Sequence, residues 1–266
     1  MTARHSPCIA LAFALLSAIP VTATARPVAA EDLFKLVFLE TPRISPDGKH
    51  VAVIRRTING PANAYETTVL LVDLASPRVA DLTRGTQDSD PVWSPNSKGI
   101  YFVRPDAAKR PQIFRHDLGK PQNLRITNIA AGATAPVPSH SGAAIAFSVL
   151  EVDSPHAARI DFSKAGFTPT KAQQRSDIRT IDNTQFELNG AGYIYDNRTH
   201  IWVAGADGSH PRQITSGRFS DTLDGWSHDD SRLVFSSTRF DPIDSGPVDI
   251  YSVPTRGGDA DKMLSD

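Results

Sequence analysis

A polar turn followed by an apolar run occurs four times in this chain, and no other sequence feature limits the fold as strongly. The four turns are Ser45–Gly48, Ser94–Ser97, Ser139–Gly142 and Ser227–Asp230. After the last turn, Leu233 and Phe235 alternate with Val234 and Ser236, so neighbouring side chains face opposite sides of a strand. Each copy therefore predicts a turn that leads into a β-strand.

The spacing of the turns indicates the size of the repeating unit. Ser45, Ser94 and Ser139 are 49 and 45 residues apart, whereas 88 residues separate Ser139 from Ser227. Residues 151–187 are polar and weakly patterned, so we interpret them as an insertion in the third repeat, partly helical at most. Repeats of roughly 45 residues with four strands each are typical of β-propeller blades.

The predicted fold class is all-β, a partial β-propeller of about four four-stranded blades with a short N-terminal helix. Apolar residues and two leading acidic residues predict that helix over Glu31–Glu40. We assign residues 26–44 to the helix and lead-in and 45–266 to the blades. Trp93 and Trp226 precede two turns and are expected to pack between blades, since a single sheet cannot bury both faces alone.

The predicted strands are His50–Arg55, Thr67–Asp73, Ala80–Gly85, Ile100–Arg104, Gln112–Asp117, Gln122–Ile126, Ala143–Leu150, Thr199–Ala204, Arg212–Gly217, Arg232–Ser237, Val248–Val253 and Lys262–Leu264.

The first 25 residues read as a secretory signal peptide. A polar start at Arg4 and His5 precedes the mostly apolar run Cys8–Val21, and residues 23–25 (Ala-Thr-Ala) have the form of a cleavage site. The run is shorter than the roughly 20 residues of a membrane span. Alternatives are an uncleaved anchor and a lipoprotein signal, but Cys8 lies at the start of the apolar run and not after it. We therefore predict cleavage after Ala25 and a periplasmic or secreted protein without a membrane span.

The composition bears on disulfide bonds and on nucleic-acid binding. Cys8 is the only cysteine, so the processed chain would contain no disulfide and would depend on a packed β-core. The formal net charge of −1 gives no indication of a surface for nucleic acid.

Several segments resemble the propeller of the prolyl oligopeptidase family, particularly its acylaminoacyl-peptidase and dipeptidyl-aminopeptidase branch. The TolB propeller carries the Ser-Pro-Asp-Gly repeat as well, but the ordered set and its insertion favour the peptidase branch. The similar segments are Ala30–Phe34, Ile44–Lys49, Gly190–Tyr193 with Thr199–Trp202, Asp207–Thr215 and Trp226–Phe235.

The resemblance implies a serine peptidase whose hydrolase domain follows the propeller and carries a Gly-x-Ser-x-Gly elbow. No two of the 17 glycines here are four residues apart, so this elbow is absent and we name no catalytic residue. Family propellers have seven or eight blades, whereas about four are predicted in this chain. The hypothesis is therefore a non-catalytic propeller portion of an exported peptidase, which gates or selects peptides in the parent enzyme. The alternative is a TolB-like periplasmic module that binds proteins.

The sequence gives little support for a metal site, a dinucleotide site or a cation site. The seven histidines of the processed chain show no His-x-x-x-His spacing, and none has a neighbouring cysteine, so we predict no metal site. Gly190 and Gly192 lack the third glycine of a dinucleotide site, and no cofactor is predicted. A cation site at Asp229–Asp230 is less favoured than a turn, because Asp47–Gly48 is the matching position.

Substrate-binding residues stay unidentified at this point. Dipeptidyl-peptidase members hold the substrate amine with two adjacent glutamates, and no two glutamates of this chain are adjacent. Glu187 could face a substrate chamber, but an exposed strand end is the simpler interpretation. The expected partners are peptides or a missing catalytic or propeller half, and in the alternative hypothesis envelope proteins.

Overall fold

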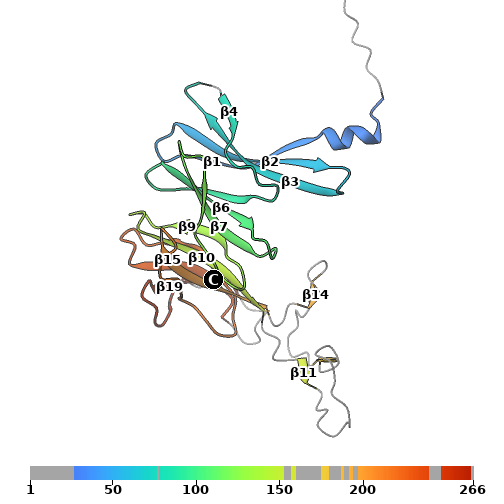
Figure 1. Cartoon of the computed structure of the whole chain (residues 1–266). Helices are drawn as coiled ribbons and strands as arrows, with labels where there is room; N and C mark the ends of the chain where they lie inside the picture. Colours follow the sequence, from blue (N-terminus) through green and yellow to red (C-terminus); the bar gives the residue numbers. More distant parts are fainter. Residues whose placement is uncertain are drawn as a thin grey trace, which may run out of the picture.

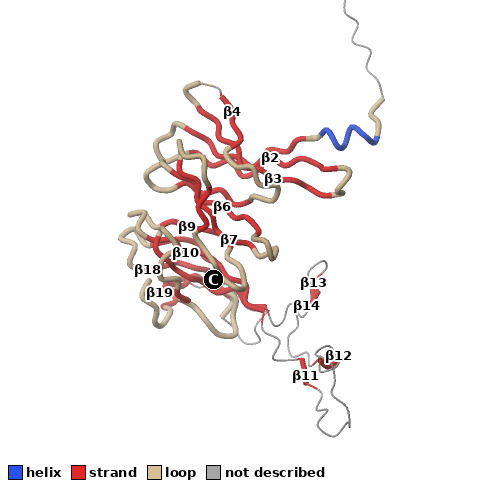
Figure 2. Tube along the Cα trace, viewed as in Figure 1, coloured by secondary structure: helices blue, strands red, loops and turns tan. Residues whose placement is uncertain are grey.

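A computed structural model describes residues 27–76, 78–152, 157–159, 175–179, 187–188, 192–193, 197–239 and 247–264. Within these ranges four antiparallel four-stranded sheets lie one after another along the chain (Figure 1). Figure 2 shows that strands dominate the described residues and that a helix lies towards the N-terminal end. The structure therefore confirms the predicted partial propeller, and each sheet is one blade.

The blade strands follow the chain in order. Blade 1 contains β1 (Val37–Ile44), β2 (His50–Asn59), β3 (Ala64–Asp73) and β4 (Arg78–Asp81), and blade 2 contains β5 (Ser89–Trp93), β6 (Gly99–Pro105), β7 (Pro111–Asp117) and β8 (Asn123–Arg125). Blade 3 contains β9 (Thr134–Pro138), β10 (Ala144–Val152), β15 (Asn197–Gly205) and β16 (Arg212–Gln213), and blade 4 contains β17 (Asp221–Trp226), β18 (Arg232–Ser237), β19 (Asp249–Pro254) and β20 (Asp261–Leu264).

The predicted insertion over 151–187 is described only in part. Its described pieces are strands: β11 (Ala157–Arg159) pairs with β12 (Arg175–Arg179), and β13 (Glu187–Leu188) pairs with β14 (Gly192–Tyr193). These described pieces contain no helix, which agrees with the prediction of partly helical at most. The turn at Gly190 and the signal peptide over 1–25 lie outside the described residues.

The N-terminal helix is shorter than the sequence predicted. It is a 3-10 helix, η1 (Ala30–Lys35), and the second half of the prediction over Glu31–Glu40 is wrong. Val37 to Glu40 pair instead with Thr57 to Ile54 of β2, because a sheet ladder satisfies backbone groups that a single short helix leaves unpaired. The first blade thus begins inside the predicted lead-in of residues 26–44.

Each blade begins with a strand that precedes its polar turn. These first strands, β1, β5, β9 and β17, each form one edge of their sheet, and β1 contacts β5, which contacts β9. We call them the inner strands. The turn serine then joins the inner strand to the second strand: the Ser45 hydroxyl accepts from the backbone N–H of His50 at 3.0 Å, and Ser94 from Gly99 at 2.9 Å. Ser139 and Ser227 accept in the same way from Ala144 and Arg232.

Apolar residues fill the space between successive blades. One cluster joins blades 1 and 2 and includes Ala52, Val69 and Phe102. A second joins blades 2 and 3 around Tyr101 and Phe147, and a third joins blades 3 and 4 around Phe235. Stacked sheets therefore bury each other's faces, which is the arrangement that the repeat predicted.

Two tryptophans link blades through their indole N–H groups. Trp93 of blade 2 donates to the backbone oxygen of Arg43 in blade 1 at 2.8 Å, and Trp226 of blade 4 donates to Val137 of blade 3 at 2.9 Å. Both indoles pack against the apolar cluster at the same blade joint. The predicted packing of these tryptophans between blades is confirmed.

Blades 2 and 4 share two further polar links to the preceding blade. The residue three places after the turn serine is in the left-handed conformation: φ is +60° at Ser97 and +57° at Asp230. The Ser97 hydroxyl accepts from the backbone N–H of Asp47 at 3.0 Å. Asp230 accepts from the backbone N–H groups of His140 and Ser141, both at 2.8 Å.

The second link is a buried aspartate at the start of the inner strand, which contacts Thr83 or His200 of the preceding blade and forms an ion pair within its own blade. Asp88 and Asp221 both lie six residues before their turn serine and are fully buried. Arg104 donates to Asp88 at 2.6 and 2.8 Å, and Arg239 donates to Asp221 at 3.0 and 3.1 Å. Burial by itself raises the pKa of Asp221, but contacts with His200, Thr215 and Arg239 outweigh it and lower that pKa.

Blade 3 has apolar or small residues at these three positions. Ala133, Pro138 and Gly142 stand where blade 2 has Asp88, Trp93 and Ser97. The joint between blades 2 and 3 therefore depends on its apolar cluster, with a hydrogen bond from the Tyr101 hydroxyl to the Ala206 oxygen at 3.3 Å. Two kinds of blade joint thus alternate along the described chain.

Glycine is required where Gly208 meets blade 2. Its φ is +88°, and a Cβ there would collide with the backbone oxygen of Ile126. Gly208→Ala is expected to combine left-handed strain of roughly 1–2 kcal/mol with an overpacking cost of about 1–3 kcal/mol. Gly48→Ala is the matched control, because φ is +71° but no atom lies within 4 Å of the added Cβ. Urea denaturation should show a clearly larger loss of unfolding free energy for Gly208→Ala, and equal losses would contradict the close approach.

The turn of blade 4 is expected to weaken in acid. Hydrogen bonds from the Ser227 and Ser231 hydroxyls and the Ser231 backbone hold the pKa of Asp229 at about 2, below its ordinary value of 3.8. Because the folded-state pKa is lowered, this contribution to stability is present above pH 3.8 and disappears as the pH falls towards 2. In urea melts between pH 5 and pH 2, Asp229→Asn should therefore lose less stability than the parent. Identical pH profiles would show that Asp229 does not contribute.

One face of blade 1 is apolar and exposed. Leu39, Ile44 and Val79 are 66%, 67% and 62% exposed. They pair with Arg55, Val51 and Val72, which alternate along their strands with the residues of the cluster on the other face. Patches of several hundred Å² on soluble proteins commonly mark interaction or aggregation sites.

We therefore expect the purified protein to self-associate through blade 1. Light scattering after size-exclusion chromatography should give a mass that rises with concentration. Leu39→Lys combined with Ile44→Lys should shift the protein towards monomer, whereas Leu124→Lys, at a residue 50% exposed on β8, should not. A concentration-independent monomer before any substitution would contradict an open blade face.

Candidate binding site at the inner strands

The inner strands of blades 1 to 3 contain the same backbone irregularity. Four residues before each turn serine, the backbone is left-handed, with φ of +47° at Thr41, +49° at Asp90 and +48° at Ala135. Each of these residues precedes a proline, and the register of its strand shifts at the same place. Bulges of this kind bend a strand and redirect its side chains.

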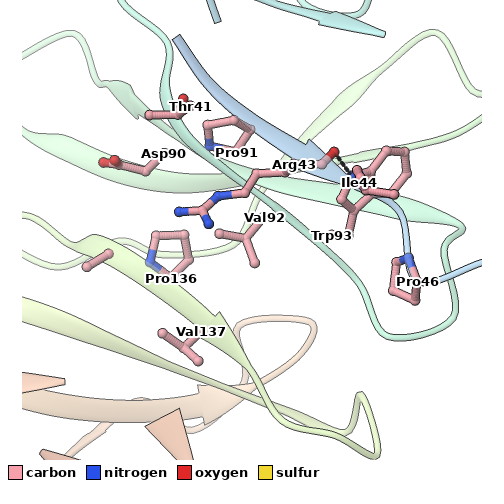
Figure 3. A pocket seen from close by; sticks show the side chains of 11 residues that line it. Thr41, Arg43, Ile44, Pro46, Asp90, Pro91, Val92, Trp93, Pro136 and Val137 are labelled. Carbon is pink, nitrogen blue, oxygen red and sulfur yellow. Dashed lines mark hydrogen bonds between the residues drawn. The ribbon is translucent and has the colours of Figure 1, made fainter. Parts of the chain in front are cut away.

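The three bulged segments lie around one pocket of about 470 Å³ (Figure 3). Its walls are mainly apolar and include Pro46, Pro91, Pro136 and Val137 together with the Trp93 ring. The polar side chains that line it are Thr41, Arg43 and Asp90. A concave apolar site with a few polar groups is the usual form of a ligand pocket.

Arg43 provides the positive charge of this pocket. Its side chain is exposed, and among the described residues its guanidinium group has no hydrogen-bond or ion-pair partner. Figure 3 shows the side chain extending away from Trp93 towards the side of the pocket where Asp90 and Pro136 lie. The Trp93 indole fixes the Arg43 backbone through the hydrogen bond to its oxygen.

Asp90 is the acidic residue at the other side of the pocket. The Ser89 hydroxyl donates to its carboxylate at 3.1 Å. Asp90 and Arg43 do not form an ion pair within 4.0 Å, although both line the same cavity. Each charge therefore stays available to a bound molecule.

The residues considered from the sequence alone lie elsewhere. His200 is buried, with Nδ1 3.9 Å from Asp221 and Nε2 4.0 Å from Glu151, so it is a packed strand residue as expected. Asp229 and Asp230 accept hydrogen bonds within and between turns, as predicted. In the part of the chain that the structure describes, no group of three metal-ligating side chains is found. The side chain of Glu187 lies outside the described residues.

Sequence reasoning missed Arg43 and Asp90. The signal that could have pointed to their strands is the pattern x-Pro-x-x-Ser, which occurs at Pro42, Pro91 and Pro136 just before three of the turns. A proline at the same place in three repeats, next to an edge, marks a bulge more readily than a regular strand.

The chain was compared with protein families and with curated proteins. No family model matches the chain. A Bacillus subtilis (strain 168) protein described as uncharacterized peptidase YuxL is 21% identical over 227 residues, which cover 84% of this chain and 33% of that protein. The chain thus spans about a third of the length of this curated relative.

Solved structures of peptidases also match this chain. The acylaminoacyl peptidase of Pyrococcus horikoshii matches with a TM-score of 0.63 and 18% identity, covering 87% of this chain and 33% of that one. The β-propeller domain of the trilobed protease from Pyrococcus furiosus matches with a TM-score of 0.54 and 16% identity, over 86% and 58% of the two chains. The chain has the fold of these peptidase propeller regions.

A TolB protein of Agrobacterium tumefaciens also matches, with 17% identity over 86% of this chain and 81% of that one. Its TM-score of 0.49 is too low to support a functional argument. Within the described ranges, no helix combines the length and the apolar character needed to cross a bilayer.

Proposed function

We propose that this chain is the non-catalytic propeller portion of an exported serine peptidase of the prolyl-oligopeptidase type, in which it selects peptide substrates. The observation that supports the proposal is the fold match to peptidase propellers over 87% of this chain and 33% of the acylaminoacyl peptidase. Export is inferred from the predicted signal peptide over residues 1–25.

The inner-strand pocket is the part of the chain that we assign to peptide contact. It lies where the first strands of blades 1 to 3 meet, and it presents one cationic and one anionic side chain between proline walls. Prolines expose rigid apolar surface, and Arg43 and Asp90, which form no ion pair with each other, offer a donor and an acceptor to peptide groups.

Two assays on the purified protein test the proposal together. Fluorescence anisotropy with labelled N-acetylated pentapeptides should show saturable binding. Chromogenic acyl-aminoacyl and dipeptidyl substrates should show no turnover that a serine-directed inhibitor blocks. Absence of peptide binding, or inhibitor-sensitive turnover, would overturn it. Capture of a single envelope protein without peptide binding would favour the TolB-like alternative.

A further inference from the structure

Among the described residues, Arg43 combines an unpaired charge with a mainly apolar pocket lined by no other cationic side chain, whereas the unpaired Arg84 lines a pocket beside Arg104 and Lys109. Arg104 and Arg239 pair with buried aspartates, Arg115 pairs with Asp117, and Arg232 pairs with Asp261. Arg43 lines the apolar pocket of about 470 Å³ and lies within 4.0 Å of no carboxylate that lines it. A guanidinium group presents its N–H donors in a planar fork that matches a carboxylate bidentately.

The surroundings of Arg43 determine what else the ligand must contain. Trp93, Val92 and the prolines Pro91 and Pro136 line the same cavity of about 470 Å³, which has room for one large apolar side chain. A free inorganic anion would leave that apolar wall exposed to water, whereas an apolar group attached to the carboxylate would cover it.

We propose that this pocket binds the carboxylate of an apolar amino-acid residue at the C-terminus of a peptide, with Arg43 as the carboxylate-binding residue. The apolar side chain of that residue packs against Trp93 and the prolines. Asp90, across the pocket, disfavours a second negative charge and accepts from N–H groups of the same ligand. This inference goes beyond the proposed peptidase role, because it concerns binding at this chain's own pocket and needs no peptide hydrolysis.

Calorimetric titration of the purified protein with Nα-acetyl-L-phenylalanine and with its C-terminal amide tests the inference. The acid should bind about tenfold more tightly than the amide, since a charge-assisted bidentate contact is lost in the amide. Arg43→Gln should weaken binding of the acid about tenfold and leave the amide unchanged. Arg256→Gln, which removes an exposed arginine in blade 4, is the matched control and should not alter either affinity.

The location of the ligand is tested separately. Intrinsic fluorescence should change on binding because Trp93 lines the pocket, and Trp93→Phe should abolish that change while Trp202 and Trp226 remain. Asp90→Asn should tighten binding of the acid by a few fold, because it removes a nearby negative charge.

Equal affinities for acid and amide, unchanged binding by Arg43→Gln, or no heat with either ligand would each overturn the inference. If acetyl-phenylalanine binds through Arg43 but the pentapeptides of the preceding test do not bind, the pocket assignment stands and the proposed peptide selection fails. If pentapeptide acids and amides bind equally well, the proposed peptide selection stands and the assignment of Arg43 as the carboxylate-binding residue fails.

Discussion

Asp88→Ala is expected to lower the free energy of unfolding by about 3 kcal/mol, the low end of the range for removing one partner of a buried ion pair. Asp88 is fully buried, and Arg104 donates two hydrogen bonds to it. The Thr83 hydroxyl of blade 1 also donates to Asp88, so the carboxylate joins two blades. Without it, the Arg104 guanidinium, 23% exposed and stacked over Phe102, loses its counter-charge.

Urea denaturation at neutral pH measures this effect. Asp81→Ala is the matched control, because Asp81 pairs with Arg55 at 2.9 Å but is 50% exposed, and exposed pairs contribute about 0–1 kcal/mol. Asp88→Leu combined with Arg104→Met should be more stable than Asp88→Ala, since an apolar replacement leaves no unpaired charge. A loss below 1 kcal/mol for Asp88→Ala would contradict the role assigned to this ion pair.

Phe147→Ala should destabilise the protein by about 3–5 kcal/mol, the usual cost of emptying a buried aromatic site. Phe147 is fully buried in the cluster between blades 2 and 3. Because this joint lacks the tryptophan link and the buried aspartate of the other two joints, we expect its stability to depend more strongly on apolar packing. The substitution should therefore also broaden the unfolding transition, as blades 1 and 2 separate from blades 3 and 4.

Calorimetry combined with urea melts checks both parts of this expectation. Leu150→Ala on the same strand is the control, because Leu150 is 47% exposed and surface changes usually fall within about 0.5 kcal/mol. Phe235→Ala, at the joint of blades 3 and 4, should cost a similar free energy without the same broadening. A sharp single transition for Phe147→Ala would show that the two joints are equally cooperative.

The second, third and fourth strands of each blade were predictable, whereas the inner strands were not. After each turn serine the chain alternates or runs apolar, as at residues 232–237, where burial alternates residue by residue. β1 and β9 give no such signal: β1 is exposed at nearly every position, and β9 contains two prolines. Prolines ordinarily argue against a strand, and here the bulges accommodate them at a sheet edge.

The pocket could not be predicted because each blade contributes a small part of it. Arg43, Asp90 and Pro136 are about 45 residues apart from one to the next, which is one propeller repeat. No local pattern marks Arg43 as unpaired, since pairing is decided by the positions of carboxylates on other blades. Recognising that the x-Pro-x-x-Ser pattern repeats would have located the three bulges but not the free guanidinium group.

From the alternation of joints we expect the described blades to bend most easily between blades 2 and 3. Indole hydrogen bonds and buried aspartates link the blades at the first and third joints, whereas the middle joint contains neither kind of link among the described residues. Pro136 and Val137 lie beyond that joint, and Arg43 and Trp93 lie before it. A molecule that touches both sides would favour one angle at this joint, and that angle would in turn set its affinity. Binding of a ligand in the pocket and the angle between blades 2 and 3 would therefore be thermodynamically coupled.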